Sequence, residues 1–334
     1  MTRSTSTRAR VQPLKINRPV RAARASASGT RSFLSIADFT PDDLRRCLSL
    51  ATDLKRSRAA GRRSVETPLS GRHIALLFDK PSLRTRVTFE VAIRELGGEP
   101  MPIPADVALG GREPASDVAR NLERWIDGVV IRTFAQQVLE GFAAAAPRLR
   151  VVNALTDEEH PCQAVADLLT LQERFGALAG RTLAYVGDGN NVATSLAQAA
   201  VMMGMHVRVA SPEGYALPER VQQQIAQLAR DGGSLSLFTR PKEAVAGVDA
   251  IYTDVWTSMG QEDEARERVR AFAGYQVDER MMAAARADAI FMHCLPAHRG
   301  EEVAAAVMDG PQSVVFDQAE NRLHGQKAIL TMLF

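Results

Sequence analysis

A run of hydroxyl and guanidinium side chains lies where an apolar segment gives way to a helical pattern. In the stretch 78-FDKPSLRTRVTFE-90 these side chains are Ser82, Arg84, Thr85 and Arg86. The start of a helix has unpaired backbone N–H groups and partial positive charge, so side chains of this kind placed there would bind an anion, and phosphate is the natural one. The stretch alone is equally typical of a plain N-cap at Ser82 followed by solvated arginines.

Donor groups also follow a second apolar segment and open a second helical pattern. Arg132 ends the apolar run 128–131, and His160 and Gln163 precede the helical pattern that begins near Val165. An arginine at the end of a strand faces any cleft at that edge of the sheet, and histidine and glutamine at a helix start can donate to a carbonyl or phosphate oxygen. Taken one at a time, an exposed loop arginine and a capping histidine would explain them as well.

The second half of the chain carries amide and carboxylate groups after its apolar segments. Residues 187–191 read Gly-Asp-Gly-Asn-Asn, which suggests a dinucleotide loop, but Val192 replaces the third glycine of that fingerprint. Asn191 is better suited to a small polar ligand. Asp254 could pair with an ammonium group, and the backbone N–H near Met259 could bind a carboxylate; an acidic turn without a ligand is the alternative.

The cysteines argue for a reducing compartment. Cys47, Cys162 and Cys294 are far apart, odd in number and without metal-ligand spacing, so neither a disulfide framework nor a zinc site is expected. Cys294 lies in the segment 293–300, where a metal would need more ligands than one thiol and two histidines. A cysteine nucleophile would need an evident base nearby, and none is indicated. One further arginine, Arg322, precedes the last helical pattern.

Strands alternating with helices are expected to position these groups. A helix opens at Thr40-Pro41-Asp42-Asp43 and runs to about Leu54, and another is expected over residues 319–334. Alternation of this kind predicts parallel sheets covered by helices, with ligands bound where strand C-termini give way to loops. Strand-like segments are expected at residues 74–78, 128–132, 150–153, 182–186, 206–210, 250–253, 289–293 and 314–316.

The composition is that of a globular protein long enough for two domains. The chain has 334 residues, of which 46% are apolar and 24% charged. A net charge of +2 gives no case for nucleic acid or an anionic membrane as a partner. No apolar run approaches a membrane span of about 20 residues. A break near residues 154–162 separates two alternating halves.

The first 30 residues differ from the rest of the chain. They are rich in arginine, serine and alanine, and the first acidic residue is Asp38. Such a segment lacks the apolar content to fold. We expect a disordered basic arm in a cytoplasmic bacterial protein; the alternative is a mitochondrial transit peptide and a location in the mitochondrial matrix.

Six short motifs occur in order along the chain. They are Ser82-Leu83-Arg84-Thr85-Arg86, His160-Pro161-Cys162-Gln163, Gly187-Asp188-Gly189-Asn190-Asn191, Asp254-Val255-Trp256-Thr257-Ser258-Met259-Gly260, His293-Cys294-Leu295-Pro296 and Glu320-Asn321-Arg322. In order and spacing they resemble the ornithine carbamoyltransferases of the aspartate/ornithine carbamoyltransferase family, from about Phe33 to the C-terminus. The resemblance implies an α/β fold of two domains, each a parallel sheet flanked by helices, with the C-terminal helix returning to the first domain.

The resemblance also implies an activity and the residues that carry it. The carbamoyl group of carbamoyl phosphate would pass to the δ-amine of L-ornithine, giving L-citrulline and phosphate in arginine biosynthesis, without cofactor or metal. The implied catalytic residues are Arg84, Arg132, His160 and Cys294. Carbamoyl phosphate would be bound by Ser82, Leu83, Arg84, Thr85, Arg132, His160, Gln163, Cys294, Leu295 and Arg322. Ornithine would be bound by Asn191, Asp254, Ser258 and Met259.

The expected organisation follows from the same resemblance. Residues 31–155, completed by 318–334, would bind carbamoyl phosphate, and residues 156–317 would bind ornithine. A homotrimer or a multiple of trimers is implied, with sites near subunit interfaces. Where many relatives place a glutamine that reaches a neighbouring site, this chain has Ala108, and Arg112 is the side chain left to reach across. A transcarbamylase for another amine, a non-catalytic carbamoyl-phosphate-binding relative and a Rossmann-type dehydrogenase are the alternatives.

Overall fold

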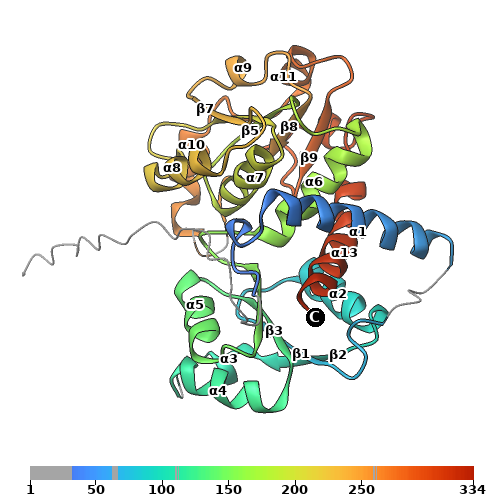
Figure 1. Ribbon diagram of the computed structural model, residues 1–334. Helices are drawn as coiled ribbons and strands as arrows, with labels where there is room; N and C mark the ends of the chain where they lie inside the picture. The colour runs from blue at the N-terminus through green and yellow to red at the C-terminus, as the bar shows by residue number, and fades with distance from the viewer. Residues whose placement is uncertain (1–31, 62–66, 110, 112, 259, 261) are drawn as a thin grey trace, which may run out of the picture.

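The computed structural model describes residues 32–61, 67–109, 111, 113–258, 260 and 262–334. They form two lobes, each built on one parallel sheet, with helices α1 (Pro41–Ala59) and α13 (Val315–Leu333) beside the junction of the lobes (Figure 1). The predicted fold class is confirmed: the chain is α/β, and its C-terminal helix returns to the first lobe, where it packs on α1 and on α2 (Leu83–Glu95).

The first sheet has four strands in the order β2-β1-β3-β4. Its strands are β1 (His73–Phe78), β2 (Glu99–Pro104), β3 (Gly128–Arg132) and β4 (Arg150–Leu155), and its helices besides α2 are α3 (Ala105–Ala108), α4 (Ala115–Trp125) and α5 (Gln136–Ala145). Successive side chains of a strand point to opposite faces of the sheet, so they pack in different helical layers. Leu76 and Val130 pack towards the layer of α1, α2 and α13, whereas Leu77 and Ile131 pack towards α4 and α5.

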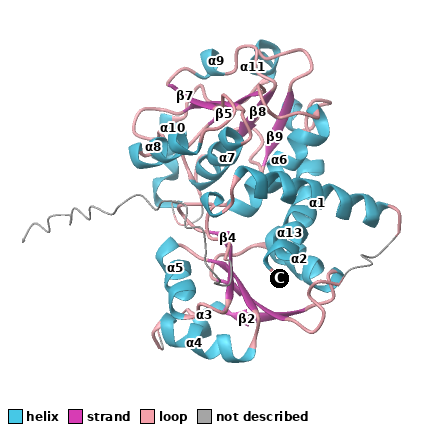
Figure 2. Cartoon of the chain, in the orientation of Figure 1, coloured by secondary structure: helices cyan, strands magenta, loops and turns pink. Residues whose placement is uncertain are grey.

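The second sheet has five strands in the order β7-β6-β5-β8-β9, with helices on both faces (Figure 2). Its strands are β5 (Thr182–Val186), β6 (His206–Ala210), β7 (Ser234–Phe238), β8 (Ala250–Thr253) and β9 (Ile290–His293). Its helices are α6 (Pro161–Phe175), α7 (Asn191–Met202), α8 (Glu219–Leu228), α9 (Pro241–Ala244), α10 (Ala265–Ala271), α11 (Glu279–Ala284) and α12 (Ala305–Met308). Tyr185 and Tyr252, fully buried neighbours with ring centroids 5.6 Å apart, stack on one face.

Helix α13 joins the two lobes. Near its start the side-chain Oε1 of Gln318 accepts the backbone N–H of His293 at 3.0 Å, in the second lobe. At its end the carbonyl of Leu333 accepts from Arg150 Nε at 2.6 Å, in the first lobe. Between these points the helix packs along α6 and is buried over most of its length. The helix therefore fixes the two sheets relative to one another.

The strand expected over 314–316 is wrong. Ser313 forms a single bridge with Phe291, and the N–H of Val314 donates to the Phe291 carbonyl at 3.0 Å, after which α13 begins at Val315. Phe316 is 70% exposed, as expected of an outward position on a helix. One β-branched pair was therefore too short a signal to distinguish a bridge from a strand.

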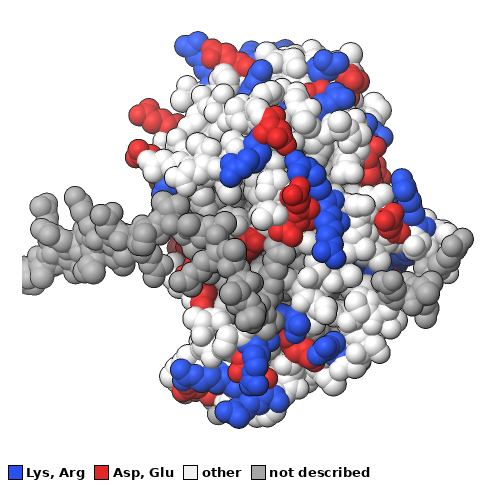
Figure 3. Space-filling model, in the orientation of Figure 1, with Lys and Arg blue, Asp and Glu red and all other residues white. Residues whose placement is uncertain are grey.

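Charged side chains of both signs are interspersed on the molecular face shown in Figure 3. Among the described residues, no helix combines the length and the apolar character needed to cross a membrane. The predicted disordered arm, residues 1–30, lies outside the described residues.

Candidate active site

The strand order creates two crevices that open towards one another. The strand order has a topological switch point between β1 and β3 in the first sheet and between β5 and β8 in the second. Ligands of α/β proteins bind at such points. Phe78 pairs in register with Arg132, and Val186 pairs with Thr253. The loops that follow these four residues therefore face a common space.

A cleft of about 1530 Å³ occupies this space, lined by both lobes and by Arg322 of α13. It contains every predicted site residue that the structure describes: Ser82, Leu83, Arg84, Thr85, Arg132, His160, Gln163, Asn191, Asp254, Ser258, Cys294, Leu295 and Arg322. Met259 lies outside the described residues, as does Arg112. Ala108, at the position of the missing glutamine, is buried at the end of α3.

The start of α2 forms one wall of the cleft. Ser82 is its N-cap, and its Oγ accepts the backbone N–H of Thr85 at 3.3 Å. Thr85 is buried, and its Oγ1 accepts a hydrogen bond from the Arg322 guanidinium of α13. Arg84 lines the same wall. A helix start and two guanidinium groups thus converge on one point, which is the electrostatic requirement for a phosphate site.

Arg132 and His160 have buried nitrogen atoms with no partner among the described residues. These atoms are Arg132 Nε and His160 Nδ1, and Arg322 Nε is in the same condition. Burial, with the Arg322 charge nearby, lowers the pKa of Arg132 to about 10, so it remains protonated near neutral pH. Burial and the same two arginines hold the pKa of His160 well below its usual value, so its imidazole is neutral. Buried polar atoms without partners are uncommon, and those that line a cleft are available to a bound ligand.

Gln163 offers an acceptor beside these donors. Its Nε2 donates to Asp167 Oδ1 at 2.8 Å, and its buried Oε1 has no partner among the described residues. Gln318 Nε2 donates to the same Asp167 oxygen at 2.7 Å. Burial raises the pKa of Asp167 to about 7. The hydrogen bond to Asp167 therefore orients Gln163 so that its carbonyl oxygen can accept from an N–H of a bound molecule.

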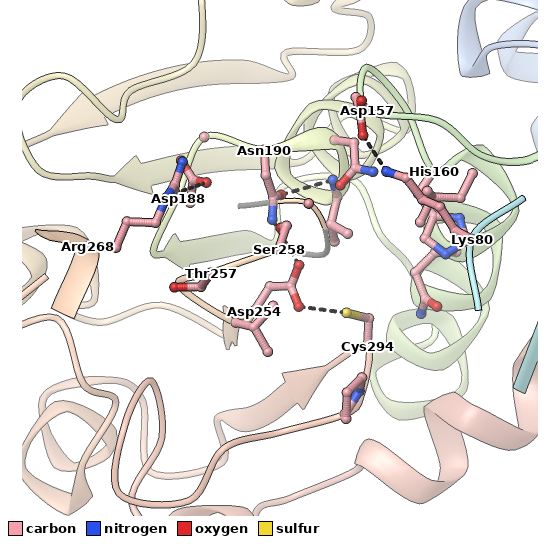
Figure 4. A pocket seen from close by; sticks show the side chains of 18 of the residues that line it. Lys80, Asp157, His160, Asp188, Asn190, Asp254, Thr257, Ser258, Arg268 and Cys294 are labelled. Atoms are coloured by element: carbon pink, nitrogen blue, oxygen red, sulfur yellow. Dashed lines mark hydrogen bonds and ion pairs between the residues drawn. The ribbon is translucent and has the colours of Figure 1, made fainter. Parts of the chain in front are cut away.

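The opposite wall carries a carboxylate held by neutral groups. Asp254 Oδ2 accepts from Asn190 Nδ2 at 2.9 Å, and Oδ1 accepts from Cys294 Sγ at 3.0 Å (Figure 4). Burial, with the charge of Asp254 beside it, raises the pKa of the Cys294 thiol well above its usual value. Cys294 is therefore a neutral hydrogen-bond donor near neutral pH, and its thiolate is not available as a nucleophile.

The remaining predicted residues lie around this carboxylate. Asn191 donates through Nδ2 to the Thr156 carbonyl, which places its side chain at the start of α7 beside the cleft. Ser258 is half-buried on the loop that follows β8. Leu295 has a left-handed backbone (φ 63°) and its N–H donates to His293 Nδ1 at 2.9 Å. The backbone of Leu295, which the resemblance implies in carbamoyl-phosphate binding, therefore lies in a turn with a left-handed residue.

Two cleft-lining ion pairs were not expected from the sequence. Lys80 is buried, pairs with Asp157 and lies 4.2 Å above the ring centroid of Phe134. Arg268 Nη1 lies 2.8 Å from Asp188 Oδ2 and also donates to the Trp256 carbonyl at 3.0 Å. Lys80 lies two residues before the first motif and Asp188 lies within the third, so proximity to a motif was the only available signal.

A metal is a second possible occupant of part of the cleft. Asp254, His293 and Cys294 offer ligand atoms within 4.8 Å of one another. The thiol, however, donates to Asp254, and the His293 ring contacts Leu295 N–H at one nitrogen and Glu302 Oε1 at the other, at 3.1 Å. Each group thus has a protein partner, which favours a hydrogen-bonded array over a metal centre.

Family models match both halves of the chain. The model described as aspartate/ornithine carbamoyltransferase, carbamoyl-P binding domain, matches residues 31–173. The model described as aspartate/ornithine carbamoyltransferase, Asp/Orn binding domain, matches residues 179–333. The two matches cover nearly all of the described chain; the first contains the four-stranded sheet and most of α6, and the second contains the five-stranded sheet and α13.

Individual proteins and structures agree with the family models. The chain is 54% identical over 305 residues to the ornithine carbamoyltransferase of Symbiobacterium thermophilum, covering 91% of this chain and 97% of the relative. It is 52% identical over 306 residues to that of Acidothermus cellulolyticus, covering 91% and 96%. The ornithine carbamoyltransferase structure from Pyrococcus furiosus superposes with a TM-score of 0.85 at 44% identity, covering 92% of this chain and 97% of that one. The chain therefore belongs to the aspartate/ornithine carbamoyltransferase family.

Proposed function

We propose that this protein transfers the carbamoyl group of carbamoyl phosphate to the δ-amine of L-ornithine, giving L-citrulline and phosphate. One observation carries the proposal: buried nitrogen atoms of Arg132, His160 and Arg322, which have no partner in the described part of the chain, line the same cleft as the start of α2 and Asp254. The first group of residues suits a phosphorylated carbonyl compound, and the carboxylate suits a cationic amino acid. The relatives named as ornithine carbamoyltransferases support the same substrates.

The donor half of the cleft would bind carbamoyl phosphate. Ser82, Leu83, Arg84 and Thr85 would hold the phosphate at the helix start, with Arg322 completing the contact. Arg132 and His160 would donate to the carbonyl oxygen, and Gln163 Oε1 would accept from the carbamoyl N–H group. Donors aimed at an oxygen that gains negative charge in the transition state lower the barrier by several kcal/mol, about 3–4 kcal/mol for a single donor.

The acceptor half would bind ornithine. Asn191, Asp254, Ser258 and the backbone near Met259 would hold its amino-acid end, and Cys294 would lie beside the reacting amine. Asp254 fits an ammonium group because it is a buried carboxylate whose recorded partners, Asn190 and Cys294, are uncharged. Met259 is included among these residues only because of its position in the motif 254–260.

The reaction needs positioning more than covalent help. The neutral δ-amine attacks the carbonyl carbon, the C–N bond forms, the C–O bond to phosphate breaks, and the amine loses a proton while phosphate takes the bonding electron pair. Arg84 and Arg322 would neutralise the charge on the departing phosphate. Holding the two substrates in attack geometry can contribute about 7–11 kcal/mol.

The decisive experiment offers four amines in parallel to the purified protein with carbamoyl phosphate: ornithine, acetylornithine, putrescine and aspartate. Citrulline formed with ornithine, and no product with the others, is the expected result. Product from another amine alone would assign the chain to a different transcarbamylase and place the error in the loop after β8. No product from any amine, with carbamoyl phosphate still bound, would indicate a non-catalytic relative.

The cellular setting extends this proposal. Arginine biosynthesis in the cytoplasm is supported by the bacterial relatives and by the resemblance, and assembly as a trimer or multiple of trimers is implied by the resemblance alone. The two sheets support domain limits near residue 155 and at the start of α13, whereas the family matches divide the chain between residues 173 and 179 and include α13 in the second match. Size-exclusion chromatography with light scattering would test the trimer directly.

A further inference from the structure

A buried carboxylate lies behind His160, on the side away from the cleft. The backbone N–H of His160 donates to Ser195 Oγ at 2.9 Å, and Ser195 Oγ donates to Glu159 Oε2 at 3.1 Å. Ser195 on α7 is fully buried and Glu159 is 7% exposed. Neither side chain lines the cleft, so neither can touch a substrate bound there.

The same carboxylate is tied to the N-terminal segment of the described chain. Glu159 Oε1 accepts from Ser35 Oγ at 2.6 Å, and Oε2 accepts the backbone N–H of Ile36 at 3.2 Å. Ser35 caps the short helix η1 (Ile36–Asp38). The carboxylate thus joins η1, helix α7 and the loop that carries His160. An ionised carboxylate is an acceptor only, so it matches three neutral donors in a way that no neutral side chain can.

The backbone of His160 needs external support. It precedes Pro161, and a residue before proline normally has ψ between about 120° and 160°. His160 instead has φ −132° and ψ 65°, and its side chain forms no capping hydrogen bond at the start of α6. The carbonyl of His160 accepts from the backbone N–H groups of Gln163 and Ala164, at 3.1 and 3.3 Å, and the bond from its N–H to Ser195 supports the same conformation from outside α6.

Keeping Glu159 ionised costs free energy, because its carboxyl group is buried. Burial raises the pKa of this carboxyl to about 7, and the neighbouring charge of Asp38 acts in the same direction, while the donors Ser35, Ile36 and Ser195 oppose the increase. A buried charge is destabilising unless hydrogen bonds compensate it, and here the three donors do so.

From this geometry we propose that Glu159 and Ser195 are positioning residues, which fix the backbone of His160 so that its imidazole meets the carbonyl oxygen of carbamoyl phosphate. The inference rests on the proposed function, since it needs a carbamoyl donor in the cleft. It predicts that loss of the Ser195 hydroxyl acts on catalysis through His160 and not through the fold.

The test is a double-mutant cycle on kcat/KM for carbamoyl phosphate, with Ser195→Ala, His160→Ala and the double variant. Ser195→Ala should lower kcat/KM by about tenfold or more, since a displacement of the order of 1 Å can cost about a hundredfold. KM for ornithine should change little. In the His160→Ala background the same substitution should change kcat/KM by less than about twofold.

Ser35→Ala is the matched control. It removes a hydroxyl from the same carboxylate, but on the η1 side and away from His160. Its kcat/KM should stay within about threefold of the wild type, the scale of one neutral hydrogen bond. Thermal unfolding of each variant separates loss of stability from loss of positioning, and Glu159→Gln enters the same cycle if Ser195→Ala does not fold.

Three outcomes decide the inference. A large loss in Ser195→Ala that disappears without His160, with Ser35→Ala near normal, supports it. An unchanged kcat/KM in Ser195→Ala, or a loss of equal size in both backgrounds, overturns it. Absence of citrulline from the wild type would instead refute the proposed function, so the two failures are distinguishable.

Discussion

The two walls of the cleft are built from opposite kinds of chemistry. The donor wall has two buried cations, Arg132 and Arg322, whose Nε atoms have no partner among the residues that the structure describes. The acceptor wall has a buried carboxylate, Asp254, whose partners Asn190 and Cys294 are neutral. The donor wall lies at strand β3 and at helices α2 and α13, whereas the acceptor wall lies on loops after β8 and β9.

The two walls therefore have different tasks: the donor wall lowers the barrier of the reaction, and the acceptor wall selects the amine. Fixed cations can stabilise charge that develops on an oxyanion and on phosphate without rearranging, and this effect lowers the barrier. A carboxylate among neutral groups binds an ammonium in the ground state and so governs which amine is held. Substitutions on the donor wall should therefore reduce kcat, and substitutions on the acceptor wall should raise KM for ornithine.

The largest expected effect is at Arg132. Arg132→Ala should lower kcat by at least about a hundredfold, the scale of one oxyanion donor, with KM for ornithine nearly unchanged. Steady-state kinetics with both substrates varied would measure this. Arg132→Lys keeps the positive charge but not the planar guanidinium group, and it is the matched control. Its kcat should fall less than that of Arg132→Ala but stay below the wild-type value. Near-normal kcat in Arg132→Ala would remove this residue from the proposed role.

Asp254 should show the opposite kinetic signature. Asp254→Asn removes the charge but keeps the shape, so KM for ornithine should rise by roughly 10- to 100-fold, the scale of a hydrogen bond to a charged group. KM for carbamoyl phosphate should change little. A fall in kcat with unchanged KM for ornithine would mean that the two walls do not divide the work in this way.

The pH profile tests which group limits the acceptor. At limiting ornithine the rate should rise by about tenfold per pH unit between pH 7 and 9, because an amine with a pKa near about 10.4 is mostly protonated there. The pKa of His160 lies below this range and that of Cys294 lies above it, so neither titrates within it. A flat profile would show that the enzyme accepts the ammonium form.

Cys294→Ala should have a smaller effect. The neutral thiol donates one hydrogen bond to Asp254, so its loss should raise KM for ornithine by about 3- to 10-fold and leave most of kcat. Alkylation of Cys294 by iodoacetamide near pH 7.5 should be slow, because the pKa of the buried thiol is raised. Complete loss of turnover with both substrates still bound would instead assign Cys294 a direct part in catalysis.

The smallest effect concerns the scaffold beneath both walls. His324 on α13 is buried, and burial lowers its pKa to about 4 despite the nearby Glu320. Between pH 6.5 and pH 4 the unfolded chain takes up a proton at this position and the folded chain does not, so the fold loses stability as pH falls. His324→Gln should reduce this loss in urea unfolding measured across the range; equal pH dependence in both proteins would contradict it.

Strands with continuous apolar segments could be predicted from the sequence. The bounds expected for β3, β5, β6 and β8 agree with the structure because each of these strands is central or well buried. The two missed strands are both edges. Strand β2 contains Pro100, Pro102 and Pro104, which are tolerated only at an edge, and β7 reads Ser-Leu-Ser-Leu-Phe and is half-exposed.

The site was predictable as a set of motifs but not as a set of contacts. Most predicted residues lie in a short motif, and Arg132 ends a predicted strand, so the type and position of each could be identified. The contact of Arg322 with Thr85 spans 237 positions, and that of Glu159 with Ser35 spans 124. No local sequence pattern predicts contacts between residues so far apart in the chain, because these contacts depend on how the helices pack between the sheets.

The position of Arg322 on α13 also bears on when the site is formed during folding. Helix α13 packs on α1, α2 and α6, and it touches both sheets. Contacts of such long sequence separation form after local ones, since the entropy of closing the intervening chain must be overcome first. A molecule in which only the first lobe has folded would have the α2 helix start but not its second guanidinium. Binding of carbamoyl phosphate would then report completion of the whole tertiary structure, and the ligand would in turn favour the docked helix.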